Sequence, residues 1–229
     1  MPTQIQKPKA NGGVHAKIEI PSRAWPSLFA KRSIDILGSL AFFSLLGWLF
    51  LIIWAAVLLT TGSPAIYKHA RVGRNGREFK CLKFRSMVTN SEEILKNLLE
   101  NDTEAKKEWD ATFKLKNDPR ITKFGRFIRK TSLDELPQFW NVLVGDMSLV
   151  GPRPVVRKEL EQYYGASAAL YNCVRPGITG PWQVGGRSDL SYEERVTLDA
   201  DYVRNHSLSG DINLMIKTVM VFVNHKGSY

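Results

Sequence analysis

A long apolar run in the first third of the chain is the feature that most restricts how these 229 residues can fold. No charged residue occurs between Ile36 and Tyr67. About 20 apolar residues are enough to cross a bilayer, and a core helix of a soluble domain is rarely apolar all round over such a length. The run also starts too late and is too long for a secretory signal. We therefore expect a membrane segment.

Basic residues on both sides of the run indicate how it sits in the membrane. Lys31 and Arg32 precede it, and a second basic stretch follows over residues 68–74. Positive charge favours the cytoplasmic side of a membrane segment, so a simple span would leave one basic flank outside. A helix that enters and turns back keeps both flanks inside, and Gly47-Trp48 near its middle would ease a break. We favour a re-entrant helix over residues 31–67, with a spanning helix as the alternative.

The rest of the chain divides around this segment. Residues 1–30 predict a flexible tail with an interfacial lead-in, and residues 68–229 predict one further domain. The net charge of +10 suits a phosphorylated substrate, an anionic membrane surface or nucleic acid. The basic residues are dispersed and carry no nucleic-acid signature, which argues against a nucleic-acid partner. Two cysteines are too few for a disulfide framework.

Hydrophobic periodicity predicts an α+β fold that is mostly helical, with amphipathic helices and a small β element. Alternation predicts a short strand over residues 79–84. Helical patterns occupy residues 90–115, 121–130, 135–143, 191–205 and 210–224. The last of these carries apolar residues at helical spacing, and we favour packing on the core over contact with the membrane for it. Glycine-rich segments between these patterns predict loops.

The stretch from Lys130 to Pro154, "KTSLDELPQFWNVLVGDMSLVGPRP", suggests where chemistry could occur. Pro137 has no N–H and fits only the first turn of a helix, which selects Asp134 as the N-cap of the helix that follows. The positive helix end should keep the Asp134 carboxylate ionised and would also stabilise a phosphate beside it. A cap with no further role is the simplest interpretation of Asp134.

Two arginines make a second interpretation worth weighing. Arg129 precedes Asp134 by a few residues and Arg153 follows in a rigid "GPRP" loop. The guanidinium fork matches the oxygens of phosphate, and an ionised carboxylate can attack phosphorus to give an acyl phosphate. Because two anions would then meet, we expect Mg²⁺ beside the pair, held by Asp134 and Glu135.

Three motifs follow the apolar run in a fixed order: "KFRSM" (83–87), "TSLDELPQFWNVLVGDMSLVGPRP" (131–154) and "RPGITGPWQVGGR" (175–187). Together they resemble the bacterial sugar transferase family, the monotopic phosphoglycosyl transferases that begin exopolysaccharide assembly. The resemblance implies a re-entrant membrane helix hairpin and a compact membrane-associated catalytic domain. It also implies transfer of galactose or glucose phosphate from a UDP-sugar to undecaprenyl phosphate, with release of UMP.

The resemblance assigns roles to particular residues. It implies that Asp134 is a nucleophile that carries the phosphosugar, and that Glu135 assists with Mg²⁺. It places several basic residues near substrate phosphate: Lys83, Arg129 and Arg153, with Arg175 and Arg187 as candidates that either bind UDP or hold their loop. Asp199, in "LDADYV", matches an acidic position whose role the resemblance does not define. At the membrane break, Gly47-Trp48 replaces the Ser-Pro that is frequent in the family, and Gly185 replaces a frequent serine or asparagine.

The same resemblance implies partners and a location. The expected partners are a UDP-sugar donor, undecaprenyl phosphate and anionic membrane lipid, and a homo-oligomer is compatible with it. The expected location is the inner membrane, with the catalytic domain facing the cytoplasm. One alternative is a metal-dependent glycosyltransferase that uses Asp199 and Asp201, although helical spacing would turn these two side chains to different faces. The other is a basic membrane-tethered binding protein without enzymatic activity.

Overall fold

The chain folds into a mostly helical α+β structure, as the sequence predicts, and it contains two small sheets. The computed structural model describes residues 25–112, 115–186 and 190–224; the tail predicted for residues 1–24, and Arg187, lie outside them. The helices are α1 (Trp25–Thr61), α2 (Ser91–Asn101), α3 (Thr103–Thr112), α4 (Lys123–Lys130), α5 (Gln138–Val144), α6 (Arg157–Glu159), α7 (Ala168–Asn172), α8 (Pro181–Gly185), α9 (Tyr192–Arg204) and α10 (Leu208–Asn224). Short 3₁₀ or π turns are η1 (Arg74–Gly76), η2 (Leu133–Glu135), η3 (Leu160–Tyr164) and η4 (Gly165–Ser167).

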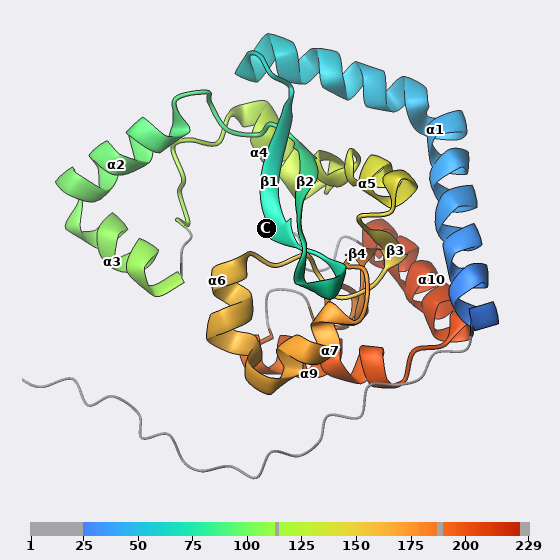
Figure 1. Ribbon diagram of the computed structural model, residues 1–229. Helices are drawn as coiled ribbons and strands as arrows, with labels where there is room; N and C mark the ends of the chain where they lie inside the picture. Colours follow the sequence, from blue (N-terminus) through green and yellow to red (C-terminus); the bar gives the residue numbers. More distant parts are fainter. Residues whose placement is uncertain (1–24, 113–114, 187–189, 225–229) are drawn as a thin grey trace, which may run out of the picture.

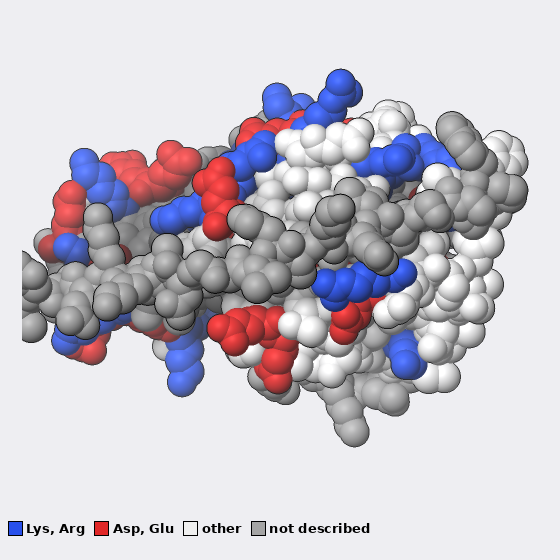
Figure 2. Space-filling model, turned by 60° about the horizontal axis from the view of Figure 1, so that its bottom comes forward, with Lys and Arg blue, Asp and Glu red and all other residues white. Residues whose placement is uncertain are grey.

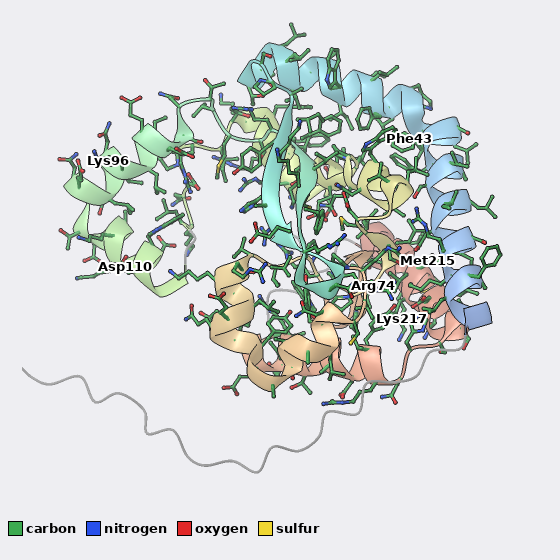
Figure 3. All side chains as sticks on the ribbon, viewed as in Figure 1. Phe43, Arg74, Lys96, Asp110, Met215 and Lys217 are labelled. Carbon is green, nitrogen blue, oxygen red and sulfur yellow. The ribbon has the colours of Figure 1, made fainter. Side chains whose placement is uncertain are left out.

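Helix α1 contains the apolar run and borders the molecule on two sides (Figure 1). By length and composition it could cross a membrane. Its helical backbone is unbroken, yet it changes direction part-way, and Figure 3 shows Phe43 beside this point. The Trp48 indole N–H donates to the carbonyl oxygen of Leu45 at 3.0 Å, one turn back on the same helix. A Cβ added at Gly47 would meet no atom within 4 Å, so the glycine is not needed there for close packing.

An antiparallel hairpin follows α1 directly. Strand β1 (Ile66–Val72) pairs with β2 (Glu78–Phe84), which contains the strand predicted over residues 79–84. The register sets Tyr67 opposite Lys83 and Arg71 opposite Phe79, so Tyr67, Arg71 and Lys83 share one face of the hairpin. The apolar residues of the other face include Phe84, which packs with Val57 of α1. The hairpin thus carries basic side chains inward from the end of the apolar helix.

A second, smaller sheet joins the two glycine-rich segments. Strand β3 (Ser148–Val150) pairs in parallel with β4 (Gly177–Thr179), where the sequence predicted only loops. A Cβ on Gly151 would lie 2.5 Å from the carbonyl oxygen of Arg175, and one on Gly177 or Gly180 would strike the backbone of Gly151. These glycines therefore serve the close approach of two backbones.

The helix predicted over residues 90–115 is broken in two. The Asp102 carboxylate accepts hydrogen bonds from the N–H groups of Glu104 and Ala105, each at 2.9 Å, and so caps a new helix. The resulting α2–α3 pair projects from the side of the molecule opposite α1 (Figure 1). Acidic and basic side chains gather on this side, whereas the surface at the α1 side is largely uncharged (Figure 2).

Helix α10 does not bury its apolar stripe, contrary to the packing favoured from the sequence. Four apolar side chains of the stripe are exposed by 46% to 62%: Ile212, Ile216, Val219 and Met220. The buried side of the helix is instead polar at its start, where Asp211 is 4% exposed and binds Lys31 of α1. Hydrophobic periodicity predicted the helix correctly. It did not predict whether the apolar face points to the core or to the outside, because that depends on which other segments pack against α10.

Candidate active site

The adjacent carboxylates Asp134 and Glu135 lie in a tight connection between α4 and α5. Helix α4 ends at Lys130, Ser132 adopts a left-handed conformation with φ of 55°, and both acids occupy the 3₁₀ turn η2. The predicted register is wrong: Pro137, not Asp134, stands at the N-cap position of α5, which begins at Gln138. The chain reverses within a few residues here, and a 3₁₀ turn closes the reversal before the proline, which has no N–H to lose, leads into the helix.

Lys83 joins the two carboxylates. Its Nζ lies 2.6 Å from Oε1 of Glu135 and 3.8 Å from Oδ2 of Asp134. Asp134 is buried, with 8% of the residue exposed, and Glu135 is partly exposed. Strand β2 therefore places the ammonium group of Lys83 beside both acids. The sequence predicted Lys83 only as a basic residue near substrate phosphate.

Arg129 and Arg153 supply further positive charge. Arg129 stands in the last turn of α4 and donates from Nε to the hydroxyl of Ser86 at 2.7 Å, which fixes the guanidinium beside the pair. It opposes the rise in the pKa of Asp134. Although burial raises the pKa of Glu135, the charges of Lys83 and Arg153 hold it below its ordinary value. The structure thus brings these five residues together around one small region.

Arg71 belongs to the same region and was missed in the sequence, where it counted only as part of a basic flank. Its guanidinium donates to the carbonyl oxygen of Pro154 at 3.2 Å, and its charge also lowers the pKa of Glu135. The signal that could have found it is the alternation of side chains along β1, which puts Arg71 on the same face of the strand as Tyr67, the residue opposite Lys83. Using that signal requires the hairpin register, which the sequence alone does not fix.

Burial dominates the ionisation of Asp134. It raises the pKa of Asp134 from an ordinary value of 3.8 to about 6; Lys83 opposes this rise, Glu135 adds to it and Arg129 opposes it. The expectation that a helix end would stabilise the charge is therefore not met, because η2 is a single short turn. Above pH 6 the carboxylate is ionised but poorly solvated, which is a favourable state for a nucleophile.

Asp199 lies apart from the pair, inside the packing of α9. It is 1% exposed and accepts a hydrogen bond from the Tyr164 hydroxyl at 2.9 Å. Burial raises the pKa of Asp199 to about 7, and the Tyr164 hydrogen bond and the charge of Arg153 oppose the rise. Asp201 points to solvent and pairs with Arg204 at 3.1 Å. The two acids of "DAD" thus face opposite ways, as predicted, and do not form a shared metal site.

Arg175 is placed elsewhere. Its Nε donates to the carbonyl oxygen of Gly145 at 2.7 Å, at the C-terminal end of α5, whereas Asp134 and Glu135 precede the N-terminal end of that helix. The structure therefore does not bring Arg175 to the pair. Arg187, the last of the predicted phosphate-binding residues, lies outside the described residues.

The carboxylate pair fits the usual demands of Mg²⁺. This ion commonly takes one or two protein carboxylates and completes its shell with water and substrate phosphates. Among the residues that the structure describes, no group of three or more His, Cys, Asp or Glu side chains could hold a metal without such help. Glu135 is kept ionised by its cationic neighbours and Asp134 is adjacent to it, so these two residues are the ones that would supply oxygen ligands.

Comparison with known proteins places this arrangement in a family. The family described as bacterial sugar transferase matches residues 26–225, nearly the whole chain. The chain belongs to the bacterial sugar transferase family. It is 55% identical over 203 residues to the UDP-galactose-lipid carrier transferase of Erwinia amylovora, covering 89% of this chain and 42% of that protein. It is 54% identical over 203 residues to the undecaprenyl-phosphate galactose phosphotransferase of Salmonella typhimurium, again covering 89% and 42%.

The length of these relatives differs from that of this bacterial sugar transferase. The chain spans about two fifths of the two proteins just named. It is also 48% identical over 200 residues to the exopolysaccharide production protein ExoY of Rhizobium meliloti, and there the match covers 87% of this chain and 88% of the relative. The motifs that pointed to the family in the sequence are thus supported by similarity across nearly the whole chain.

Proposed function

We propose that this chain transfers a hexose 1-phosphate from a UDP-sugar to undecaprenyl phosphate, the first membrane step of exopolysaccharide synthesis. The observation that carries the proposal is the buried Asp134 carboxylate beside Glu135, with Lys83 bridging the two and arginines around them. Such a site suits chemistry at phosphorus, because the positive charges can take up the charge of a diphosphate. The names of the relatives, which include phosphotransferases of undecaprenyl phosphate, agree with it.

The reaction proceeds in two displacements at the same phosphorus. A carboxylate oxygen of Asp134 attacks the phosphorus attached to the sugar, the bond to the second phosphate breaks, and UMP leaves. An oxygen of undecaprenyl phosphate then attacks the aspartyl phosphosugar, which releases Asp134 as a carboxylate and gives a lipid diphosphate sugar. Arg129 and Lys83 lie where they can bind the transferred phosphate in both steps.

Glu135 has a supporting part in this proposal. It stays ionised and holds Lys83 at 2.6 Å, which keeps the ammonium group beside Asp134. With Asp134 it would hold Mg²⁺, which when bound offsets repulsion between the carboxylates and the diphosphate. Arg71 and Arg153 keep the charge around Glu135 positive, and Arg71 also restrains the loop through its hydrogen bond to the carbonyl oxygen of Pro154.

The direct test is transfer of radiolabel from a UDP-hexose to undecaprenyl phosphate by the purified full chain in membranes or detergent. We expect labelled lipid and one UMP for each sugar transferred. UDP-galactose is expected to be the preferred donor over UDP-glucose and UDP-N-acetyl sugars, since the relatives named for galactose are 54% and 55% identical and one named for glucose is 39% identical. A chain that supports no transfer from any nucleotide sugar contradicts the proposal and revives the binding-protein alternative.

The acid limb of the pH profile should report on Asp134. Its carboxylate is the reacting form, and its pKa is about 6, so formation of the labelled protein should fall about tenfold per pH unit below 6. Lys83→Met removes a charge that lowers this pKa, so the limb should move to higher pH. Lys80→Met on the same strand, where the side chain is exposed, is the matched control. Rapid-quench measurements of protein labelling between pH 5 and pH 8 test this shift. If the acid limb has the same midpoint in Lys83→Met and Lys80→Met, Lys83 does not lower the pKa of Asp134.

We also propose that α1 enters the cytoplasmic leaflet and returns. Support comes from its two ends, which pack on the same folded domain. Near the start, Lys31 forms an ion pair with Asp211 at 2.7 Å, and near the end, Val57 packs with Phe84 and Ile128. A helix that crossed the membrane would separate these contacts by the width of the bilayer.

Tags at the two ends of the chain test this placement. Both tags should be cleaved by protease in inverted membrane vesicles and protected in spheroplasts, because both ends lie on the cytoplasmic side. Cleavage of the N-terminal tag from the periplasm would establish a spanning helix instead. A periplasmic reporter protein cleaved in the same spheroplasts serves as the control for protease access.

A further inference from the structure

A second cluster of arginines lies at the far end of α5 from the candidate active site. It lines a cavity of about 50 Å³ between the start of α1, β3, η1 and the segment that follows α7. This volume holds a few water molecules, so it has room for one phosphate group and not for a nucleotide. The charged residues of the wall are Lys31, Arg32, Asp35, Arg74 and Arg175.

Two of these arginines already have structural partners. Arg32 donates to the carbonyl oxygens of Val142 at 2.6 Å and Leu143 at 2.9 Å, and Arg175 donates from Nε to that of Gly145. They satisfy carbonyls at the C-terminal end of α5, the negative end of the helix dipole. The terminal nitrogens of Arg175 make no hydrogen bond among the described residues and remain available to a ligand.

Arg74 has a different status. It projects from the η1 turn next to α7, as Figure 3 shows, and its side chain makes no hydrogen bond or ion pair within the described part of the chain. Its charge and that of Arg32 help to lower the pKa of Arg175, although burial contributes more. An exposed arginine with nothing to pair with would ordinarily turn away from two others, yet it lines the same cavity.

Acidic groups in the wall do not balance this charge. Asp35 is the acid that lines the cavity, and its Oδ1 accepts hydrogen bonds from the Ser148 hydroxyl and the Leu149 N–H, each at 2.9 Å. Lys31 is already neutralised by Asp211 at 2.7 Å. The charge of Asp146 also raises the pKa of Arg175. Three guanidinium groups therefore stand against the carboxylates of Asp35 and Asp146, which leaves a surplus of positive charge around a small space.

We infer that this cavity is a second anion site, in which Arg74 and Arg175 bind a phosphate group separate from the one that reacts at Asp134. The phosphate belongs either to a free phosphate ion or to the headgroup of an anionic lipid. The headgroup is sterically accessible because the cavity lies beside the start of the apolar helix, next to Leu28. The inference does not depend on the transferase reaction, since none of these residues contacts the carboxylate pair.

Cys173 gives the site its own probe. It lines the cavity and is partly exposed, whereas Cys81 is buried and burial raises the pKa of its thiol to about 11. A maleimide should therefore label the native chain at Cys173, and loss of labelling in Cys173→Ser confirms the position. The rate of labelling then measures occupancy of this cavity without interference from phosphate bound near Asp134.

The experiment uses the full chain in neutral detergent and in lipid nanodiscs. Inorganic phosphate should slow labelling of Cys173 relative to chloride at equal ionic strength, or phosphatidylglycerol nanodiscs should slow it relative to phosphatidylcholine nanodiscs. Protection by phosphate assigns the site to a free ion, and protection by phosphatidylglycerol alone assigns it to a lipid. Arg74→Gln should raise the phosphate concentration, or the phosphatidylglycerol fraction, for half protection about tenfold.

Arg77→Gln is the matched control, because Arg77 is exposed on the same turn and does not line the cavity. It should retain the protection seen in the unaltered chain. The inference is overturned if neither phosphate nor phosphatidylglycerol protects Cys173, or if Arg74→Gln and Arg77→Gln weaken protection equally. Thermal unfolding of both variants establishes that each is folded, and since both side chains are exposed, neither is expected to lower Tm.

Discussion

Asp134→Asn is expected to lower transfer of phosphosugar to undecaprenyl phosphate by at least about 10³-fold, because an amide is a far weaker nucleophile than a carboxylate. Incubation with a radiolabelled UDP-sugar and no acceptor should label the unaltered protein covalently and release UMP. The variant should give neither label nor UMP. Asp201→Asn is the control, since that side chain is exposed on α9 and its ion-pair partner within the described part of the chain is Arg204.

The same variant should be more stable than the unaltered chain at pH 7.5. Burial raises the folded-state pKa of Asp134 to about 6 from 3.8, so the charged form is disfavoured by folding. This cost is present above pH 6 and disappears below the unfolded value near 3.8, where both states are protonated. It corresponds to at most about 3 kcal/mol at pH 7.5.

Thermal denaturation at pH 7.5 and pH 4 separates loss of chemistry from loss of fold. A variant that is inactive and has a higher Tm at pH 7.5, with a smaller difference at pH 4, agrees with a buried nucleophile. If Asp134→Asn is inactive because it is unfolded, its failure to become labelled says nothing about the nucleophile. The labelling test is then made on folded Asp134→Ser. Transfer that survives either substitution contradicts the covalent intermediate.

The sequence predicted which side chains gather at the site better than it predicted the backbone that holds them. Lys83, Arg129 and Arg153 were each selected from a motif or from their distance to Asp134 in the sequence. The structure brings all three to Asp134 and Glu135. Arg153 stands in the "GPRP" loop, where glycine and proline restrict the backbone beside the charged group. The register of the carboxylates was wrong, since a helix start and a 3₁₀ turn before a proline look alike in sequence.

What the sequence could not give depends on contacts between distant segments. Arg71 joins the site only because β1 and β2 pair in a particular register. Arg175 leaves it because β4 pairs with β3 and carries the arginine to the other end of α5. The apolar stripe of α10 faces outward because Asp211 occupies its buried side with Lys31. Periodicity describes one segment at a time and carries no information about these pairings.

Gly125→Ala is expected to have the largest effect on stability. Gly125 lies in the first turn of α4, and a Cβ there would lie 1.9 Å from the carbonyl oxygen of Ser86. The obstacle is backbone, so it cannot rotate away as a side chain would. Helix α4 would have to move, which breaks the hydrogen bond from the Thr122 N–H to the same oxygen at 3.2 Å and the one from Arg129 to the Ser86 hydroxyl.

We expect this substitution to lower the free energy of unfolding by about 3 kcal/mol or more, since the clash adds strain to lost contacts. Gly47→Ala is the matched control, because no atom lies within 4 Å of a Cβ at that position in α1. Thermal and denaturant unfolding in detergent compares the two variants. Arg129→Gln separates the contributions, since it should lower transfer without a comparable loss of Tm. If Gly125→Ala is as stable as Gly47→Ala, then the stability of α4 does not depend on its close approach to Ser86. Some other contact must then hold Arg129 beside Asp134.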